Sequence, residues 1–77
     1  MIKKTVNQFM KQVAKENGLN IEKMSDKIGR SNASLGFSLR NETLTVKDLA
    51  KCLNEVGQPL VLVYKGENYE IDLNLKN

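Results

Sequence analysis

The chain has 77 residues, with twelve Lys and Arg against nine Asp and Glu, so its formal net charge is +3 and its length is that of one small domain. Histidine does not occur, which excludes the usual general base and the His-dependent catalytic triads. A single cysteine, Cys52, excludes an internal disulfide and a cysteine cluster for a metal.

The first apolar stripe predicts a helix between residues 3 and 17. Its apolar side chains recur at helical spacing at Val6, Phe9, Met10 and Val13. Asn17 and Gly18 then offer the left-handed turn that ends a helix. Asn20 is a good N-cap for a second, short helix that ends at Gly29. Its apolar residues Ile21, Met24 and Ile28 recur at helical spacing.

Two further helices are predicted in the middle of the chain. Ser31 can cap a helix over residues 32–40, with Leu35 and Leu39 on its inner face and Gly36 inside it. Thr45 and Asp48 form a start similar to a capping box. The helix that follows, ending at Gly57, is expected to bury Val46, Leu49, Ala50, Leu53 and Val56.

After Pro59 the apolar period changes from helical to extended. The run Leu60, Val61, Leu62, Val63 and Tyr64 predicts one strand, residues 65–68 a turn, and the alternation from Tyr69 to Leu75 a second strand. Because a two-stranded hairpin is marginal in water and the first strand is apolar on both faces, we expect a second copy to pair or stack with it, so that Leu60–Tyr64 form a homodimer interface. The alternative is a monomer in which the first helix covers the other face.

The sequence thus predicts a mainly α fold with a small β element, as one domain over residues 1–77. Residues 1–57 form its helical part and residues 58–77 the hairpin. The second and third helices are joined only by Gly29, Arg30 and Ser31, which is the spacing of a helix-turn-helix.

At these residues the sequence resembles the Cro and Xre type of phage and plasmid regulators. Met24, Ile28 and Leu35 match the aliphatic core of that family, Gly29 its turn glycine, and Ser31 the small hydroxyl residue that opens the recognition helix. Four positions depart from the pattern. Ser25 stands where the family prefers Ala, Arg30 where it prefers Val or Ile, Ser38 where it prefers an aliphatic residue, and Ile21 replaces a frequent phosphate-binding Gln. The resemblance implies a DNA-binding transcriptional regulator, a repressor from a phage or other mobile element.

Helical geometry then assigns a reading face to residues 32–40. Asn32, Ala33 and Phe37 project away from Leu35 and Leu39, and Ser34 lies at the edge of this face. These four are the candidate contacts to DNA bases in the major groove. Arg30, Ser31, Arg40 and Asn41 flank this face and are the candidate phosphate contacts. Simpler readings remain open for three kinds of residue: a solvated helix start for Asn32, core packing for Phe37, and solvated surface charge for Arg30 and Arg40.

Catalysis is not expected. Glu70 and Asp72 alternate with apolar residues on a solvated strand face, and Cys52 reads as a small, semi-buried apolar residue. No cofactor or metal is predicted. The longest apolar run has five residues, against roughly 20 needed to cross a bilayer, which with the lone cysteine predicts a soluble, cytoplasmic protein. The rival class is a protein-binding module on the same scaffold, such as an antitoxin or a small phage-encoded inhibitor.

Overall fold

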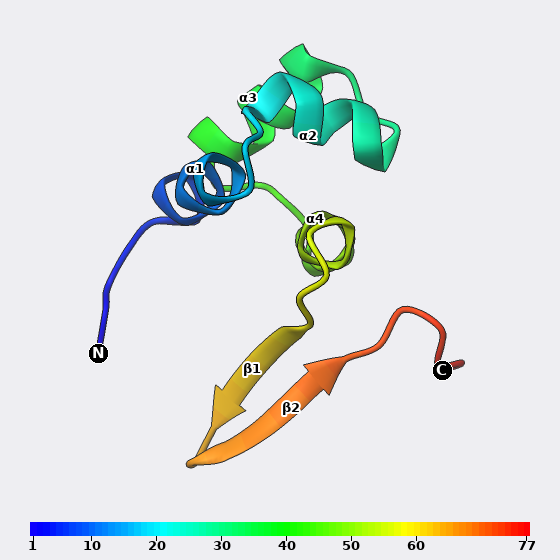
Figure 1. The fold of residues 1–77 in the computed structure, drawn as a ribbon. Helices are drawn as coiled ribbons and strands as arrows, with labels where there is room; N and C mark the ends of the chain where they lie inside the picture. Colours follow the sequence, from blue (N-terminus) through cyan, green and yellow to red (C-terminus); the bar gives the residue numbers. More distant parts are fainter. The chain divides into compact units, whose positions relative to one another are not determined.

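The computed structural model describes residues 1–77 as four helices followed by a two-stranded antiparallel hairpin (Figure 1). The elements are α1 (Val6–Glu16), α2 (Ile21–Ile28), α3 (Asn32–Arg40), α4 (Val46–Glu55), β1 (Leu60–Tyr64) and β2 (Glu67–Ile71). The predicted fold class, mainly α with a small β element, is confirmed. None of the four helices combines the length and the apolar composition needed to traverse a bilayer.

The chain divides into two compact units. The first, Met1–Leu44, contains α1, α2 and α3, and the second, Thr45–Asn77, contains α4 and the hairpin. The sequence suggested a division at residue 57, between helices and hairpin. In the structure α4 belongs with the hairpin, because β1 packs on that helix within the second unit.

Side-chain caps define the ends of the helices in the first unit. Thr5 accepts from the backbone of Gln8, and Gln8 bonds back to the backbone of Thr5, which is a complete capping box at the start of α1. Asn20 accepts from the backbone of Lys23 at 2.8 Å, as predicted for α2. Between these helices the backbone N–H of Leu19 donates to the carbonyl of Ala14 at 2.8 Å, so α1 ends in the expected left-handed turn.

The buried side chains of the first unit come from all three of its helices. They are Met10 and Ala14 from α1, Met24 and Ser25 from α2, and Leu35, Ser38 and Leu39 from α3. Val6 and Phe9, which share the apolar stripe of α1 with Met10, are each 37 % exposed. Ala14, four residues after Met10, occupies the inward position instead, which moves the buried stripe of α1 away from Phe9.

Helix α4 of the second unit begins where its cap was predicted. Thr45 accepts from the backbone of Asp48 at 3.1 Å. Ala50, Leu53 and Cys52 are buried, and the burial of Cys52 is complete. Val46 was expected in the core but is 53 % exposed. It is the first residue of α4, at the end of the helix.

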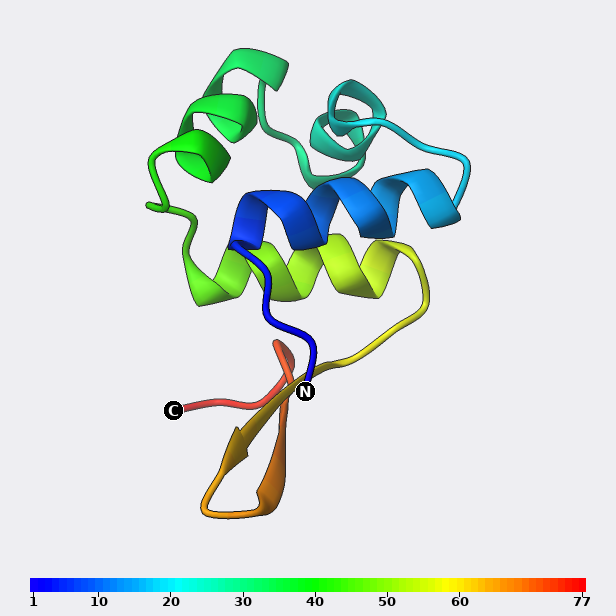
Figure 2. The ribbon, with the colours of Figure 1, turned by 90° about the vertical axis from the view of Figure 1, so that its left-hand side faces the viewer.

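The hairpin has a tighter turn and a shorter second strand than predicted. Tyr64 pairs with Glu67, which leaves Lys65 and Gly66 as a two-residue turn (Figure 2). Both turn residues have positive φ, 50° and 78°, as a type I′ turn requires. Strand β2 ends at Ile71, opposite Leu60, so Leu73 and Leu75 lie outside the ladder.

Candidate nucleic-acid interface

Helices α2 and α3 form a helix-turn-helix in which Gly29 makes the turn possible. Gly29 caps α2 with φ 74°, a left-handed conformation that L side chains rarely adopt. Ser31 follows in extended conformation, and its hydroxyl accepts from the backbone of Ser34 at 3.1 Å to start α3. The two helices pack against each other across this short connection.

The structure separates the inner from the outer face of α3 as the helical period predicts. Leu35 and Leu39 are each 1 % exposed, whereas all four predicted base contacts, Asn32, Ala33, Ser34 and Phe37, are exposed. Phe37 keeps 57 % of its surface open, so core packing does not explain this residue. The outer face of α3 therefore exposes one amide, one hydroxyl, a methyl group and an aromatic ring to solvent.

Arg30 does not point away from the protein as a phosphate contact would. Its guanidinium Nη2 donates to the hydroxyl of Ser34 at 2.6 Å, to the hydroxyl of Ser38 at 2.8 Å and to the carbonyl of Ser34 at 3.1 Å. The side chain is half-buried. In the free protein Arg30 therefore has a structural role, because it ties the turn to two successive turns of α3, and its contact with phosphate stays a prediction.

The polar side chains of Ser25, Arg30 and Ser38 all form hydrogen bonds within the helix-turn-helix. Ser25 is fully buried and its hydroxyl donates to the carbonyl of Glu22 at 2.6 Å. The guanidinium of Arg30 donates to the hydroxyl of Ser38, which is 8 % exposed. No buried polar side-chain atom is left without a partner. The sequence does not reveal this pairing, because its members lie eight residues apart.

Two other predicted phosphate contacts, Ser31 and Asn41, act as caps of α3. Asn41 is the C-cap, and its side-chain amide donates to the carbonyl of Phe37 at 2.9 Å. Both residues are exposed. Their placement at the ends of α3 keeps them next to the reading face, and their contact with phosphate stays a prediction.

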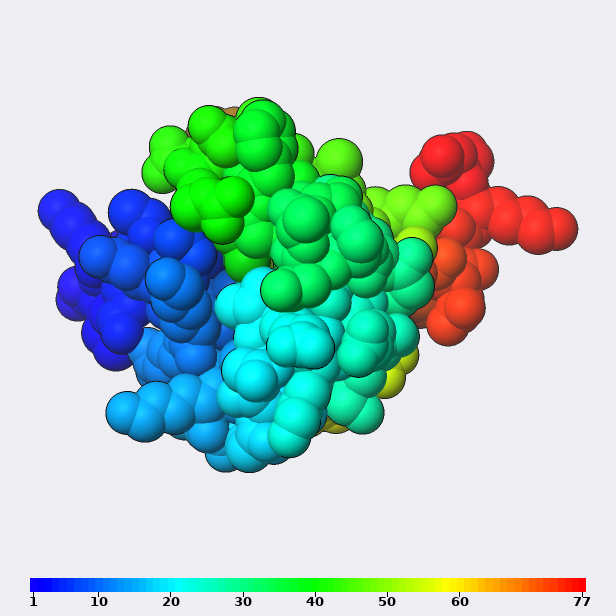
Figure 3. Space-filling model, turned by 90° about the horizontal axis from the view of Figure 1, so that it is seen from above, coloured from blue at the N-terminus to red at the C-terminus, as the bar shows by residue number.

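Arg40, the last residue of α3, is exposed and borders a depression in the first unit. Figure 3 shows the surface of the helices of this unit from above. The depression has a volume of about 260 Å³ and is lined by residues of all three helices: Asn7, Lys11, Ile21, Asn32, Ala33, Gly36, Leu39 and Arg40. Helix α1 was not among the elements that the sequence predicted for the site. The signal was present, since Asn7 and Lys11 are four residues apart and share one face of that helix.

The positive charge of the chain belongs to the unit that contains the helix-turn-helix. Residues 1–44 hold eight Lys and Arg against four Asp and Glu, a net charge of +4, and residues 45–77 hold four against five, a net charge of −1. This uneven distribution favours an anionic partner for the first unit.

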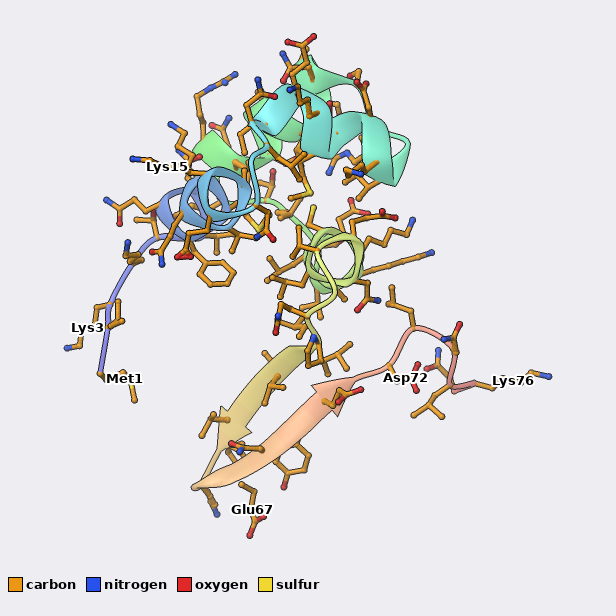
Figure 4. The ribbon with its side chains drawn as sticks, in the orientation of Figure 1. Met1, Lys3, Lys15, Glu67, Asp72 and Lys76 are labelled. Carbon is orange, nitrogen blue, oxygen red and sulfur yellow. The ribbon has the colours of Figure 1, made fainter.

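The predicted dimer strand is only partly available. Leu60 is 7 % exposed and belongs to the core, which corrects its assignment to an interface. Val61 and Leu62 are each 43 % exposed, Val63 68 % and Tyr64 62 %. Figure 4 labels Glu67 beside the hairpin turn and Asp72 just past the end of β2, so the carboxylates of this hairpin belong to β2 and its exit. The exposed residues of β1 form an uncharged strand with one open edge.

Known proteins add nothing to this assignment: no family model matches the chain, and neither a curated protein nor a solved structure is significantly similar to it.

Proposed function

We propose that the chain is a sequence-specific DNA-binding regulator that inserts α3 into the major groove and acts as a repressor by occupying its site. The observation that carries this proposal is the exposed outer face of α3, built on a helix-turn-helix within a unit of net charge +4. Asn32 suits an adenine edge, and Ala33 and Phe37 suit thymine methyl groups, which favours A·T-rich sites. A cytoplasmic location accords with this function.

The protein would bind as a homodimer through the hairpin. Strand β1 has no charged residue and an unpaired edge, which is a template for another strand. In an antiparallel pair centred on Leu62, Val61 of one copy faces Val63 of the other, so the strand is complementary to itself. Such a pair extends the hairpin to four strands and covers apolar surface that two strands leave in water.

The experiment that tests DNA recognition selects the binding site from random sequence. Duplexes with a randomised core of roughly 24 base pairs, enough for two half-sites one helical turn apart, are selected on the protein. The enriched duplex and a scrambled one are then compared by fluorescence anisotropy across a salt series. We expect a shared palindromic motif, weaker binding to the scramble, and a log affinity that falls linearly with log salt concentration. No enrichment and no binding at low salt would reject the proposal.

Arg40→Ala is expected to weaken binding without unfolding the protein. Arg40 is exposed and flanks the reading face, so its loss removes a phosphate contact from each copy. We expect affinity to fall about 3–10-fold on every duplex, with a salt slope smaller by about 0.9 per copy. Circular dichroism melting serves as the control for folding. An unchanged affinity would remove Arg40 from the interface.

Gly36→Ala is expected to separate stability from binding. Glycine inside a helix costs about 1 kcal/mol relative to alanine, and an added Cβ at Gly36 would meet only the flexible end of Arg40, at 3.0 Å. The variant should therefore melt a few degrees higher, by up to about 8 °C. Its DNA affinity should fall, since the new methyl group stands on the face where α3 approaches the bases. Higher stability with unchanged affinity would place Gly36 outside the interface.

A protein-binding module is the second candidate, and one observation favours it. The outer face of α3 has few donors for base edges, because the hydroxyl of Ser34 already accepts from Arg30, while Phe37 is a large exposed apolar anchor. If the selected duplex fails, Phe37→Ala should abolish binding to the protein partner that a pull-down retrieves.

A further inference from the structure

The depression between α1 and α3 concentrates positive charge that nothing in the chain neutralises. Lys11 comes from α1 and Arg40 from α3, and neither side chain forms a hydrogen bond or ion pair within the protein. No Asp or Glu lines the depression. Two cations that enter one hollow without a carboxylate repel each other, so an anion bound between them relieves that repulsion.

The size and lining of the depression select a small anion. Its volume of about 260 Å³ lies below the roughly 300–1,000 Å³ of pockets that take whole cofactors or drug-sized ligands. Ala33 contributes only a methyl group to the lining and Gly36 has no side chain. A ligand can therefore approach the α3 backbone closely. Asn7 adds an amide donor from α1. A lysine, an arginine and an amide around a compact space are donors that suit a phosphate group.

We propose that this depression seats one phosphate of the DNA backbone between Lys11 and Arg40, which makes α1 part of the DNA interface. The inference rests on the proposed function and goes beyond the recognition helix and its flanks. Asn32 connects the two parts of the surface, since it lines the depression and is also a candidate base contact. A phosphate held there fixes how far α3 enters the groove and in which register.

The test removes either the positive charge of the protein or the negative charge of the DNA phosphate. On the selected duplex, Lys11→Gln should weaken binding about 3–10-fold. Methylphosphonate groups, which lack the phosphate charge, are then placed one at a time along the same duplex. One position in each half-site should weaken the parent protein, weaken Lys11→Gln and Arg40→Gln by a smaller factor, and have no effect on the double variant that lacks both cations.

Lys15→Gln is the matched control, because Lys15 is an exposed lysine of the same helix that does not line the depression (Figure 4). It should keep the sensitivity to that methylphosphonate position. If the parent protein binds and every position remains additive with Lys11→Gln, the phosphate seat is refuted while the proposed function stands. If the parent protein binds no duplex, the proposed function fails and the seat with it.

Discussion

A Val63→Asp variant is expected to be a monomer that binds its selected duplex about 10²–10⁴-fold more weakly than the parent chain. Val63 is 68 % exposed on the uncharged strand β1, so an aspartate there leaves the folded hairpin intact but would be buried without a partner in a dimer. In a dimer, once one copy has bound its half-site, the second copy binds the other half-site in an intramolecular step. A monomer loses this step, so its affinity falls strongly.

The register of the hairpin explains why Val63, and not Val61, is the residue to change. Val61 pairs with Glu70, so an aspartate at residue 61 would set two carboxylates directly opposite each other and destabilise the hairpin itself. Val63 pairs with Asn68, which carries no charge. Multi-angle light scattering gives the oligomeric state, and anisotropy on full and half sites gives the affinity.

Two controls accompany this variant. Val63→Thr keeps the β-branched shape and should remain a dimer, and Asn77→Asp adds the same charge at the exposed last residue and should also remain one. A parent chain that is monomeric at concentrations far above its DNA affinity would contradict the dimer. A Val63→Asp variant that stays dimeric would move the interface away from β1.

The helical half of the fold was readable from the sequence because its signals are local. The caps Asn20, Ser31 and Thr45 each bond three residues ahead, so residue type and spacing are sufficient to predict them. The end of the second strand was harder to predict from the sequence. Its alternation continues to Leu75, but β1 starts directly after Pro59, which has no N–H to offer a ladder, so β2 finds no partner beyond Ile71.

The turn of the hairpin was misplaced for a different reason. A type I′ turn needs positive φ at both central residues, which asparagine and glycine adopt readily and lysine does not. Lys65 nevertheless has φ 50°, because a two-residue connection is required to pair Tyr64 with Glu67. Strand pairing overrides the local preference of one residue here, and composition alone favours a longer turn.

The candidate site shows the same contrast between local and distant information. Which residues of α3 face outward follows from the helical period, and the prediction for Asn32, Ala33 and Phe37 was confirmed in that respect. The direction of a long side chain does not follow from the period. Arg30 is predicted on the phosphate surface because it flanks the outer face of α3 in the sequence, whereas its hydrogen bonds to Ser34 and Ser38 are visible only in three dimensions.

That difference makes Arg30 the subject of the second large effect. Arg30→Val is expected to lower the free energy of unfolding by about 1–2 kcal/mol, because the hydroxyl of Ser38, in a residue 8 % exposed, loses its charged donor. Ser38→Ala alone should cost little, since Arg30 still bonds to Ser34. The double variant should return to within about 0.5 kcal/mol of the parent chain, as expected when both partners of a buried hydrogen bond become apolar.

Urea unfolding of the four proteins measures this cycle, and the m-value should stay constant across it. DNA binding supplies the readout that separates a structural from a contact role. If Arg30 only positions α3, the double variant binds with an unchanged salt slope, because no phosphate contact has been removed. A salt slope smaller by about 0.9 per copy would mean that Arg30 leaves Ser34 and Ser38 when DNA binds. If the changes in unfolding free energy of the two single variants simply add in the double variant, the contact between Arg30 and Ser38 does not stabilise the helix-turn-helix.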